Sequence, residues 1–237
     1  MVMSLKSHED GPIDEVAAGT TVYVYEAPVR LWHWVNALSI VVLAITGYLI
    51  ASPLPTVPGE ANDHFLMGYI RFAHFAAAYI FAIGFLVRIY WAVVGNHHAR
   101  QLFYLPVTDK VWWEGLFREI RWYMFIEKTP HKYIGHNPLG HFFMFFAITV
   151  GGIFMLVTGF ALYGEGAQAG TWSHTLFSSW VIPLYGQSQD VHTWHHMVAW
   201  GIVVFMILHV YTAIREDIMS RQTMVSTIIS GHRTFRE

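Results

Sequence analysis

The sequence predicts an all-α membrane protein, built as a bundle of four transmembrane helices. Three observations lead to this fold class. Hydrophobic residues make up 54% of the 237 residues and charged residues only 13%, a composition typical of integral membrane proteins. Four stretches are apolar over at least the roughly 20 residues that a helix needs to cross a bilayer. Lysine and arginine are concentrated in alternate connecting segments, as expected for a chain that crosses a membrane repeatedly.

The spans divide the chain into a membrane domain with a polar segment at each end. Residues 1–22 are polar, and we expect a mobile tail there, without a cleavable signal peptide. The transmembrane domain is predicted at 23–214 and a second tail at 215–237. A segment rich in proline and glycine ends the first span. The four predicted spans are residues 31–51, 69–94, 139–163 and 191–214.

The distribution of lysine and arginine predicts the orientation. The connections at 52–68 and 164–190 contain neither residue, whereas the two ends of the chain and the long loop at 95–138 contain several. By the positive-inside rule, both termini and the long loop lie in the cytoplasm. We therefore expect a multi-pass protein of the cell inner (cytoplasmic) membrane, in contact with the lipid bilayer.

The cytoplasmic loop contains a candidate amphipathic helix at residues 109–128. Apolar side chains fall on one helical side: Trp113, Leu116, Phe117, Ile120 and Met124. Basic side chains fall toward the other: Lys110, Arg118 and Arg121. We predict an interfacial helix that lies on the membrane surface. The alternative is a helix on the soluble side of the membrane with a solvated basic face.

The fourth span carries histidines, which apolar spans rarely contain. His195 and His209 are 14 residues apart, so they lie within about 40° of each other on one helical face and about 21 Å apart along it. His192 and His196 are rotated away from that face. A lone histidine in a span often serves packing only, but a co-facial pair at this rise indicates a haem iron at each level. One helix supplies one axial ligand per haem, so two partner histidines are required elsewhere.

Two histidines of other spans lie at matching depths. His33 is at the cytoplasmic start of the first span, level with His209, and His74 is near the outer start of the second span, level with His195. The sequence therefore predicts two haems stacked across the bilayer, an inner one held by His33 and His209 and an outer one held by His74 and His195. This pairing assumes that the helices concerned are neighbours. Gly47, 14 residues after His33, offers a patch without a side chain at the outer haem, or a site of helix packing.

Three arginines are candidate partners of the haem propionates. Arg30 and Arg71 precede His33 and His74 by three residues, so each shares a helical face with its histidine. Arg88 follows His74 by 14 residues and lies at the depth of the inner haem. Such cations can bind anionic propionates, or they can extend to the membrane interface instead.

Composition limits the chemistry further. The chain has no cysteine, which excludes protein-held iron–sulfur clusters, covalently attached haem and disulfides. The net charge of −2 gives no sign of a nucleic-acid partner. We find no catalytic constellation in the sequence. A haem with both axial positions filled is suited to one-electron transfer rather than to substrate binding at iron.

Six segments and two short patterns carry a resemblance to a known family. The segments are YVYEAPVRLWHWVNALSIVVLAITG, FLMGYIRFAHF, GHNP, VTGFALYGEG, DVHTWHHM and AIREDIMSRQTMVSTIISGHRTF. The patterns are R-x-x-H-W…T-G (Arg30, His33, Trp34, Thr46 and Gly47) and REDIM (Arg215–Met219). Over nearly all of the chain after about Tyr23, the sequence resembles the b-type cytochrome subunits of membrane-bound nickel–iron uptake hydrogenases, a dihaem family similar to cytochrome b561.

The resemblance implies a four-helix cytochrome with two haem b groups that anchors a periplasmic hydrogenase heterodimer of small and large subunits. Electrons from hydrogen would leave the iron–sulfur chain of the small subunit, pass through the haems and reduce a quinone near the cytoplasmic haem. The chain would then be an electron-transfer subunit without a hydrogen-activating site of its own. By similarity, the axial ligands are the four residues that the spacing selects: His33, His74, His195 and His209.

Three other interpretations remain open. A cytochrome b subunit of the formate dehydrogenase or thiosulfate reductase type would have the same haem arrangement with a different partner, and the connections at 52–68 and 164–190 would discriminate between them. A histidine-lined transporter of divalent metals would require carboxylates within the spans, which contain none. A purely structural anchor would leave the matching depths of four histidines unexplained.

Overall fold

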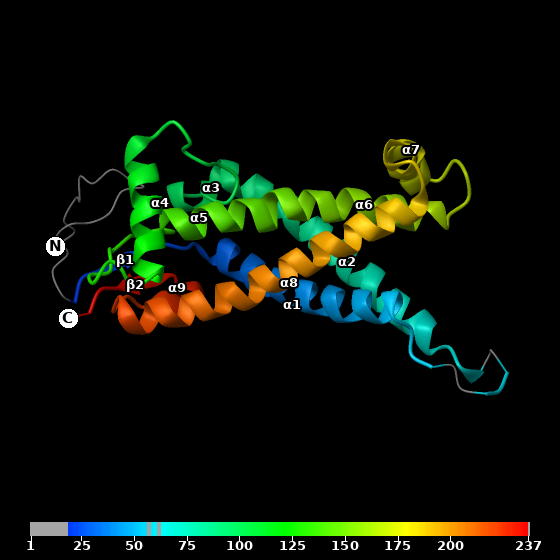
Figure 1. Ribbon diagram of the computed structural model, residues 1–237, viewed down its shortest axis with the longest axis horizontal. Helices are drawn as coiled ribbons and strands as arrows, with labels where there is room; N and C mark the ends of the chain where they lie inside the picture. Colours follow the sequence, from blue (N-terminus) through cyan, green and yellow to red (C-terminus); the bar gives the residue numbers. More distant parts are fainter. Residues whose placement is uncertain (1–18, 56–57, 61–62, 237) are drawn as a thin grey trace. The chain divides into compact units, whose positions relative to one another are not determined.

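The protein is described here by a computed structural model that covers residues 19–55, 58–60 and 63–236. Most of the expected N-terminal tail, residues 1–18, lies outside the described residues. Within the described part of the chain, four helices are long and apolar enough to cross a membrane (Figure 1). They confirm the prediction of four apolar spans.

The four long helices extend beyond the predicted spans. Helices α1 (Ala27–Ala51), α2 (Leu66–Val94) and α8 (Ser188–Met219) are continuous. The remaining span, Pro138–Glu165, is interrupted by a π-helical turn at Phe145–Val150. Each helix begins before its predicted span or ends after it, because backbone hydrogen bonding continues through the polar residues that flank an apolar segment.

The interrupted span consists of α5 (Pro138–Met144) before the π-helical turn and α6 (Gly151–Glu165) after it. Asn137 caps α5, because its side chain accepts a hydrogen bond of 2.6 Å from the backbone N–H of Gly140. Proline at the first helical position fits this start, since its missing N–H would have no partner inside the helix.

The chain forms two compact units. Among the described residues, unit 1 comprises 19–31, 89–150 and 204–236, and unit 2 comprises 32–55, 58–60, 63–88 and 151–203. Each of the four long helices therefore contributes residues to both units.

Short elements complete unit 1. Strand β1 (Thr21–Tyr23) pairs antiparallel with β2 (His232–Thr234), which follows the short helix α9 (Met224–Ser230) (Figure 1). Helices α3 (His97–Arg100) and α4 (Lys110–Tyr123) belong to the long loop. The segment after the last predicted span is thus folded: α8 continues through its first residues, and α9 and β2 follow.

A buried arginine joins the C-terminal strand to the long loop. Arg233 is only 2% exposed, and its Nη1 donates hydrogen bonds of 2.7 Å to the carbonyl oxygens of Tyr133 and Gly135. Gly231 makes the turn before the strand possible, because its φ of 86° is a conformation that glycine adopts easily. These contacts integrate the end of the chain into unit 1.

Helix α4 confirms that the predicted segment 109–128 contains a helix, and its buried side chains include only part of the predicted apolar side. Asp109 caps the helix by accepting a hydrogen bond from the backbone N–H two residues on. Trp113 and Phe117, both on the predicted apolar side, are exposed. The larger buried side chains are Trp112, Leu116, Glu119 and Trp122. The position of the helix on a membrane surface stays a prediction.

Unit 2 has a small core at one end of α6. Helix α7 (Ser179–Tyr185) packs there, with Ala161, Val181 and Val191 at the centre. The hydroxyl of Ser178 donates to the carbonyl oxygen of Ala161 at 2.6 Å, which fixes the connecting segment against the helix.

Candidate functional site

Helix α8 presents the predicted histidines on different faces. His195 is half-buried in unit 2, whereas His192 and His196 are exposed. The ring of His196 is occupied locally, because its Nε2 accepts a 2.9 Å hydrogen bond from Nε1 of Trp200. The structure therefore separates His195 from its two neighbours, as the helical spacing predicts.

A threonine of α1 holds the ring of His74. The distance from Thr46 Oγ1 to His74 Nδ1 is 2.9 Å. The hydroxyl proton of Thr46 is already used, because it donates to the carbonyl oxygen of Val42 one turn earlier, at 2.6 Å. The threonine oxygen must then accept from the imidazole, so Nδ1 of His74 carries the proton.

The same arrangement recurs at His195, from a different helix. Thr158 of α6 lies 2.7 Å from His195 Nδ1 and donates its own proton to the carbonyl oxygen of Phe154, also at 2.7 Å. Thr158 is 1% exposed, so no solvent competes for its lone pairs. His195 therefore also carries its proton on Nδ1 and keeps the lone pair on Nε2.

Each threonine is followed by a glycine whose lack of a side chain leaves room for the same ring. A Cβ placed on Gly47 would lie 3.3 Å from Cε1 of His74, and one placed on Gly159 would lie 3.3 Å from Cε1 of His195. Glycine thus allows the helix backbone to approach the imidazole closely. We name this arrangement, Thr46–Gly47 and Thr158–Gly159, the Thr-Gly steps.

Sequence reasoning did not assign a role to the threonines. Both Thr-Gly steps stand in segments that the resemblance selects, and a search for that dipeptide in two spans would have found them. Gly47 was predicted either to face the outer haem or to serve helix packing, and the structure places it against the ring of a predicted ligand of that haem.

The residues of unit 2 fit a bis-histidine iron site. His74 and His195 come from different helices and are close enough to interact electrostatically. Their Nδ1 atoms are bound by the threonines, which leaves Nε2, the nitrogen that commonly ligates haem iron, free to do so. A histidine ligand normally donates its second ring N–H to a partner, and both threonines supply that partner.

The other two predicted ligands belong to different units. His33, in unit 2, is half-buried and meets the ring of Trp34 edge-on at 5.1 Å. His209, in unit 1, stacks on the ring of Phe205 at 5.5 Å. Their pairing at an inner haem stays a prediction from their depth in the spans.

The three predicted propionate partners have different surroundings. Arg30 donates from Nη1 to the carbonyl oxygen of Ile229 in α9, so it also has a structural role in unit 1. Arg71 is exposed on α2. Arg88 is 3% exposed, and its guanidinium lies over the ring of Trp32 at 5.4 Å, within the range of a cation–π contact. Their contacts with propionates stay predictions.

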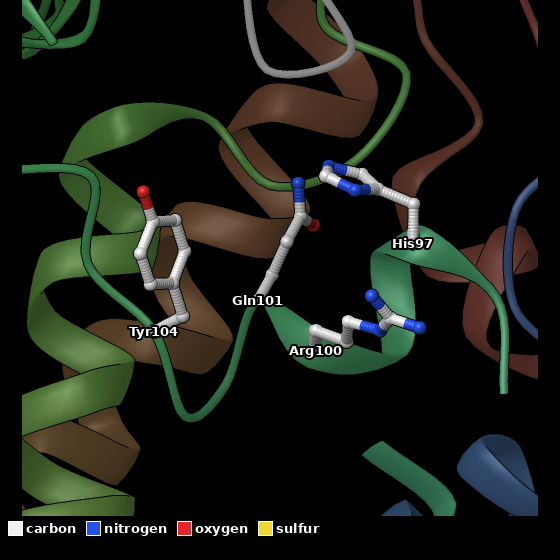
Figure 2. Close-up of a pocket in the computed structure, with 4 residues that line it drawn as sticks. All are labelled: His97, Arg100, Gln101 and Tyr104. Atoms are coloured by element: carbon white, nitrogen blue, oxygen red, sulfur yellow. The ribbon is translucent and has the colours of Figure 1, made fainter. Parts of the chain in front are cut away.

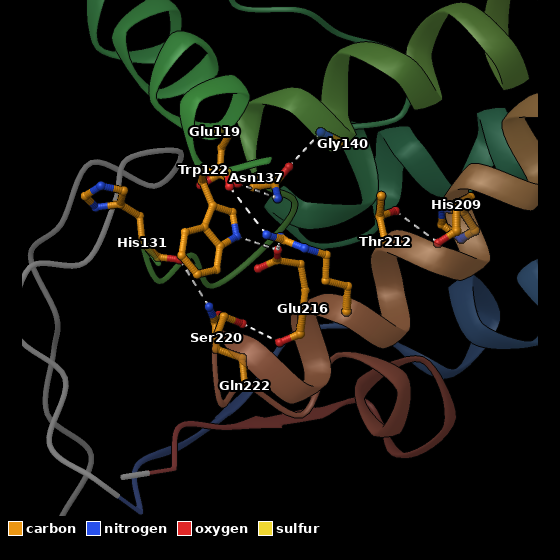
Figure 3. A network of polar contacts seen from close by, with 11 residues as sticks. Glu119, Trp122, His131, Asn137, Gly140, His209, Thr212, Glu216, Ser220 and Gln222 are labelled. Carbon is orange, nitrogen blue, oxygen red and sulfur yellow. Dashed lines mark hydrogen bonds and ion pairs between the residues drawn. The ribbon is translucent and has the colours of Figure 1, made fainter. Parts of the chain in front are cut away.

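Unit 1 contains a buried polar network that sequence reasoning missed (Figure 3). The carboxylate of Glu216 in α8 accepts a 2.8 Å hydrogen bond from Nε1 of Trp122. It also forms an ion pair with Arg215, with 3.0 Å between Nη1 of the arginine and Oε1 of the glutamate. Asn137 donates to the buried carboxyl of Glu119 at 3.2 Å. Burial, with Glu216 nearby, raises the pKa of Glu119 to about 8, although Arg215 opposes the shift. The REDIM and GHNP patterns contain several of these residues and were its only visible signal.

The histidine of the GHNP pattern, His136, also forms hydrogen bonds in unit 1. His136 lies between Tyr25, whose hydroxyl is 3.1 Å from Nε2, and Gln101, whose Oε1 is 3.0 Å from Nδ1. Burial keeps the pKa of His136 well below its usual value, and the nearby His141 adds to this effect. The imidazole is therefore neutral near pH 7 and acts as a hydrogen-bonding link between the start of the chain and the long loop.

An open cavity of about 350 Å³ lies beside α3, lined by His97, Arg100, Gln101 and Tyr104 (Figure 2). It contains none of the predicted iron ligands. The cavity belongs to unit 1 and to the loop that sequence analysis places in the cytoplasm.

Fold and site together define a class: a helical membrane protein with paired span histidines suited to haem iron. The family profile of prokaryotic cytochrome b561 matches residues 24–231, and the chain belongs to this family. As b-type cytochromes, its members use haem b as their cofactor.

Curated relatives match almost the full length of the chain. A protein of Azotobacter vinelandii named "Probable Ni/Fe-hydrogenase B-type cytochrome subunit" is 64% identical over 233 residues, which are 98% of this chain and 97% of the relative. A protein of the same name from Cupriavidus necator is 63% identical over 225 residues, 94% of this chain and 92% of the relative. The "Probable Ni/Fe-hydrogenase 1 B-type cytochrome subunit" of Escherichia coli K12 is 47% identical over 220 residues, 90% of this chain and 91% of the relative.

Proposed function

We propose that this chain is the membrane-anchoring, dihaem cytochrome b subunit of a nickel–iron hydrogenase. It carries electrons from the oxidation of hydrogen, received from the iron–sulfur clusters of the small subunit, to the quinone pool. Support for the partner comes from the names of relatives that match more than nine-tenths of the chain at 63–64% identity. The chain itself supplies electron transfer and no hydrogen-activating site.

The observation that carries the electron-transfer role is the pair of oriented imidazoles in unit 2. His74 and His195 keep Nε2 free because Thr46 and Thr158 bind Nδ1. Haem b, when bound, supplies one-electron redox chemistry at its iron. By the sequence analysis, His33 and His209 would hold a second haem, and Arg30, Arg71 and Arg88 would bind propionates.

The surrounding residues would keep the site dry and rigid. Polar contacts at the two rings come from hydroxyls whose protons are bound to their own helices, so little reorganisation accompanies a change of charge at the site. We place both termini and the long loop in the cytoplasm, in the cell inner membrane, because lysine and arginine are concentrated there. The periplasmic hydrogenase subunits would then meet the connections at 52–68 and 164–190.

Haem stoichiometry and redox spectroscopy of the purified protein test this function. We expect two low-spin haem b groups per chain in the wild type, and one in each of His74→Ala and His209→Ala, with a different haem lost in each. His192→Ala is the control, because this exposed histidine lies on the same helix and should leave both haems in place. Absence of haem from the wild type, or two haems in both alanine variants, would contradict the proposal.

The partner is tested separately, on the complex purified from the membrane. Hydrogen should reduce the haems of the intact complex, and an added quinone should reoxidise them. Reduction by formate but not by hydrogen would instead indicate a cytochrome of the formate dehydrogenase type.

A further inference from the structure

We propose that Thr46 and Thr158 are positioning residues that set the redox potential of one haem, each acting through its own histidine. This inference rests on the proposed function, and it goes beyond ligand assignment. Both threonines are fixed by hydrogen bonds to their own helices, and both present a lone pair to an Nδ1–H group.

The direction of the effect follows from the donor and acceptor roles. An imidazole that donates its Nδ1–H to an acceptor gains electron density and becomes a more basic ligand through Nε2. A more basic ligand stabilises the oxidised iron relative to the reduced iron. Each threonine should therefore lower the midpoint potential of the haem that its histidine ligates.

The two contacts are equivalent in detail. In each, a threonine one position before a glycine accepts from a ring nitrogen, and a Cβ placed on the glycine would lie 3.3 Å from Cε1 of the same ring. The hydrogen bond restricts the rotation of the ring, and the absence of a side chain at the glycine leaves room for the ring beside the helix. A ring held by this hydrogen bond has a defined orientation, and this orientation also shapes the low-spin spectrum of the iron.

Two separate helices, α1 and α6, supply these steps to ligands on α2 and α8. If His74 and His195 share one iron, then the two threonines act on the same haem. The second haem of the chain would serve as an internal reference within the same sample.

The test uses the full-length protein with Thr46→Val and Thr158→Val. Valine is close to threonine in shape but offers no acceptor, so the ring loses its hydrogen bond to the threonine with little change in volume. Thr46→Ser and Thr158→Ser are the matched controls, because serine keeps the hydroxyl. Potentiometric titration followed by optical spectra gives both midpoint potentials, and electron paramagnetic resonance gives the low-spin signals.

We expect both valine variants to raise the midpoint potential of the same haem and to leave the other haem unchanged, with both serine variants close to the wild type. Each threonine acts on its own histidine. If one valine variant does not fold or bind haem, the other therefore still tests the effect of a threonine on the midpoint potential. Unchanged potentials in a valine variant that retains haem would overturn the inference, as would equal shifts with serine and valine, or shifts of two different haems. These outcomes leave the proposed function standing, whereas a wild-type protein without haem would remove both.

Discussion

The buried polar side chains of units 1 and 2 have different roles. In unit 2, the hydroxyls of Thr46 and Thr158 each bind one imidazole. In unit 1, the carboxylate of Glu216 binds Trp122 and Arg215, which joins α4 to the end of α8. A neutral hydroxyl orients a ring at little cost, whereas a buried charge is tolerated only when its neighbours compensate it. The hydroxyls of Thr46 and Thr158 in unit 2 thus act on the predicted ligands, whereas the carboxylate of Glu216 in unit 1 holds the fold together.

The largest expected effect is the loss of a haem through a change in unit 2. His195→Ala should remove the same haem as His74→Ala, because we assign both rings to one iron. The haem content of the purified protein, measured with the absorption spectrum of the haem that remains, checks this. His196→Ala is the control on the same helix, since that ring is exposed and bound to Trp200. If His195→Ala and His74→Ala remove spectrally different haems, the pairing is wrong.

A change in unit 1 should destabilise the fold and leave the haem potentials alone. Arg233→Met removes two hydrogen bonds from a charged donor to the carbonyl oxygens of Tyr133 and Gly135. We expect a loss of about 3 kcal/mol of unfolding free energy, since bonds to charged groups contribute about 1.5–3 kcal/mol each and the sum is rarely reached. Unfolding of the detergent-solubilised protein measures this, with Arg236→Met as the exposed control. A stable Arg233→Met variant with altered haem potentials would contradict the structural role that we assign to unit 1.

An intermediate effect is expected at the Thr-Gly steps. Gly159→Val places branched carbon atoms where even a Cβ would lie 3.3 Å from Cε1 of His195, so the ring or the helix must move. Overpacking of this kind costs about 1–3 kcal/mol. Gly201→Val is the matched control, because nothing lies within 4 Å of a Cβ at that glycine of α8. Unfolding and the low-spin resonance signal report the change, and equal effects of the two variants would show that contact with the ring is not the cause.

The four spans and the rotation of His195 away from His192 and His196 could be predicted from the sequence, because apolar length and helical periodicity are local properties. The roles of Thr46 and Thr158 could not, since each depends on the register between two helices that are distant in sequence. A threonine in an apolar span most simply binds its own helix, as both of these do.

Unit 1 was predicted less well, for a different reason. The C-terminal segment is short, polar and mixed in composition, and its strand forms only by pairing with residues near the other end of the chain. Helix α4 buries Glu119, which pattern rules place on a solvent face, because Asn137 and the surrounding network satisfy it. Trp113, which we assign to the apolar side of a helix on the membrane surface, is exposed, so its contact with the membrane stays a prediction.

The last prediction concerns the pH dependence of unit 1. Burial and the nearby Glu216 raise the pKa of Glu119 from 4.5 to about 8. The unfolded chain loses this proton near pH 4.5, whereas the folded chain keeps it to about pH 8, so folding takes up a proton between these values. Stability should therefore fall as pH rises from about 4.5 to 8, by at most about 1.4 kcal/mol per pH unit, and this contribution should be constant above that range.

Glu119→Gln tests this, because glutamine keeps the shape and an acceptor for Asn137 but does not titrate. Unfolding of the detergent-solubilised variant should show a shallower decrease between about pH 5.5 and 8 than the wild type. Glu114→Gln is the control, since Glu114 is exposed on the same helix. An unchanged slope in Glu119→Gln would mean that Glu119 is already ionised in the folded protein. The charges of Arg215 and Arg118 would then affect the pKa of Glu119 more strongly than burial does. The network of unit 1 would in that case be a set of ion pairs rather than one that contains a protonated carboxyl group.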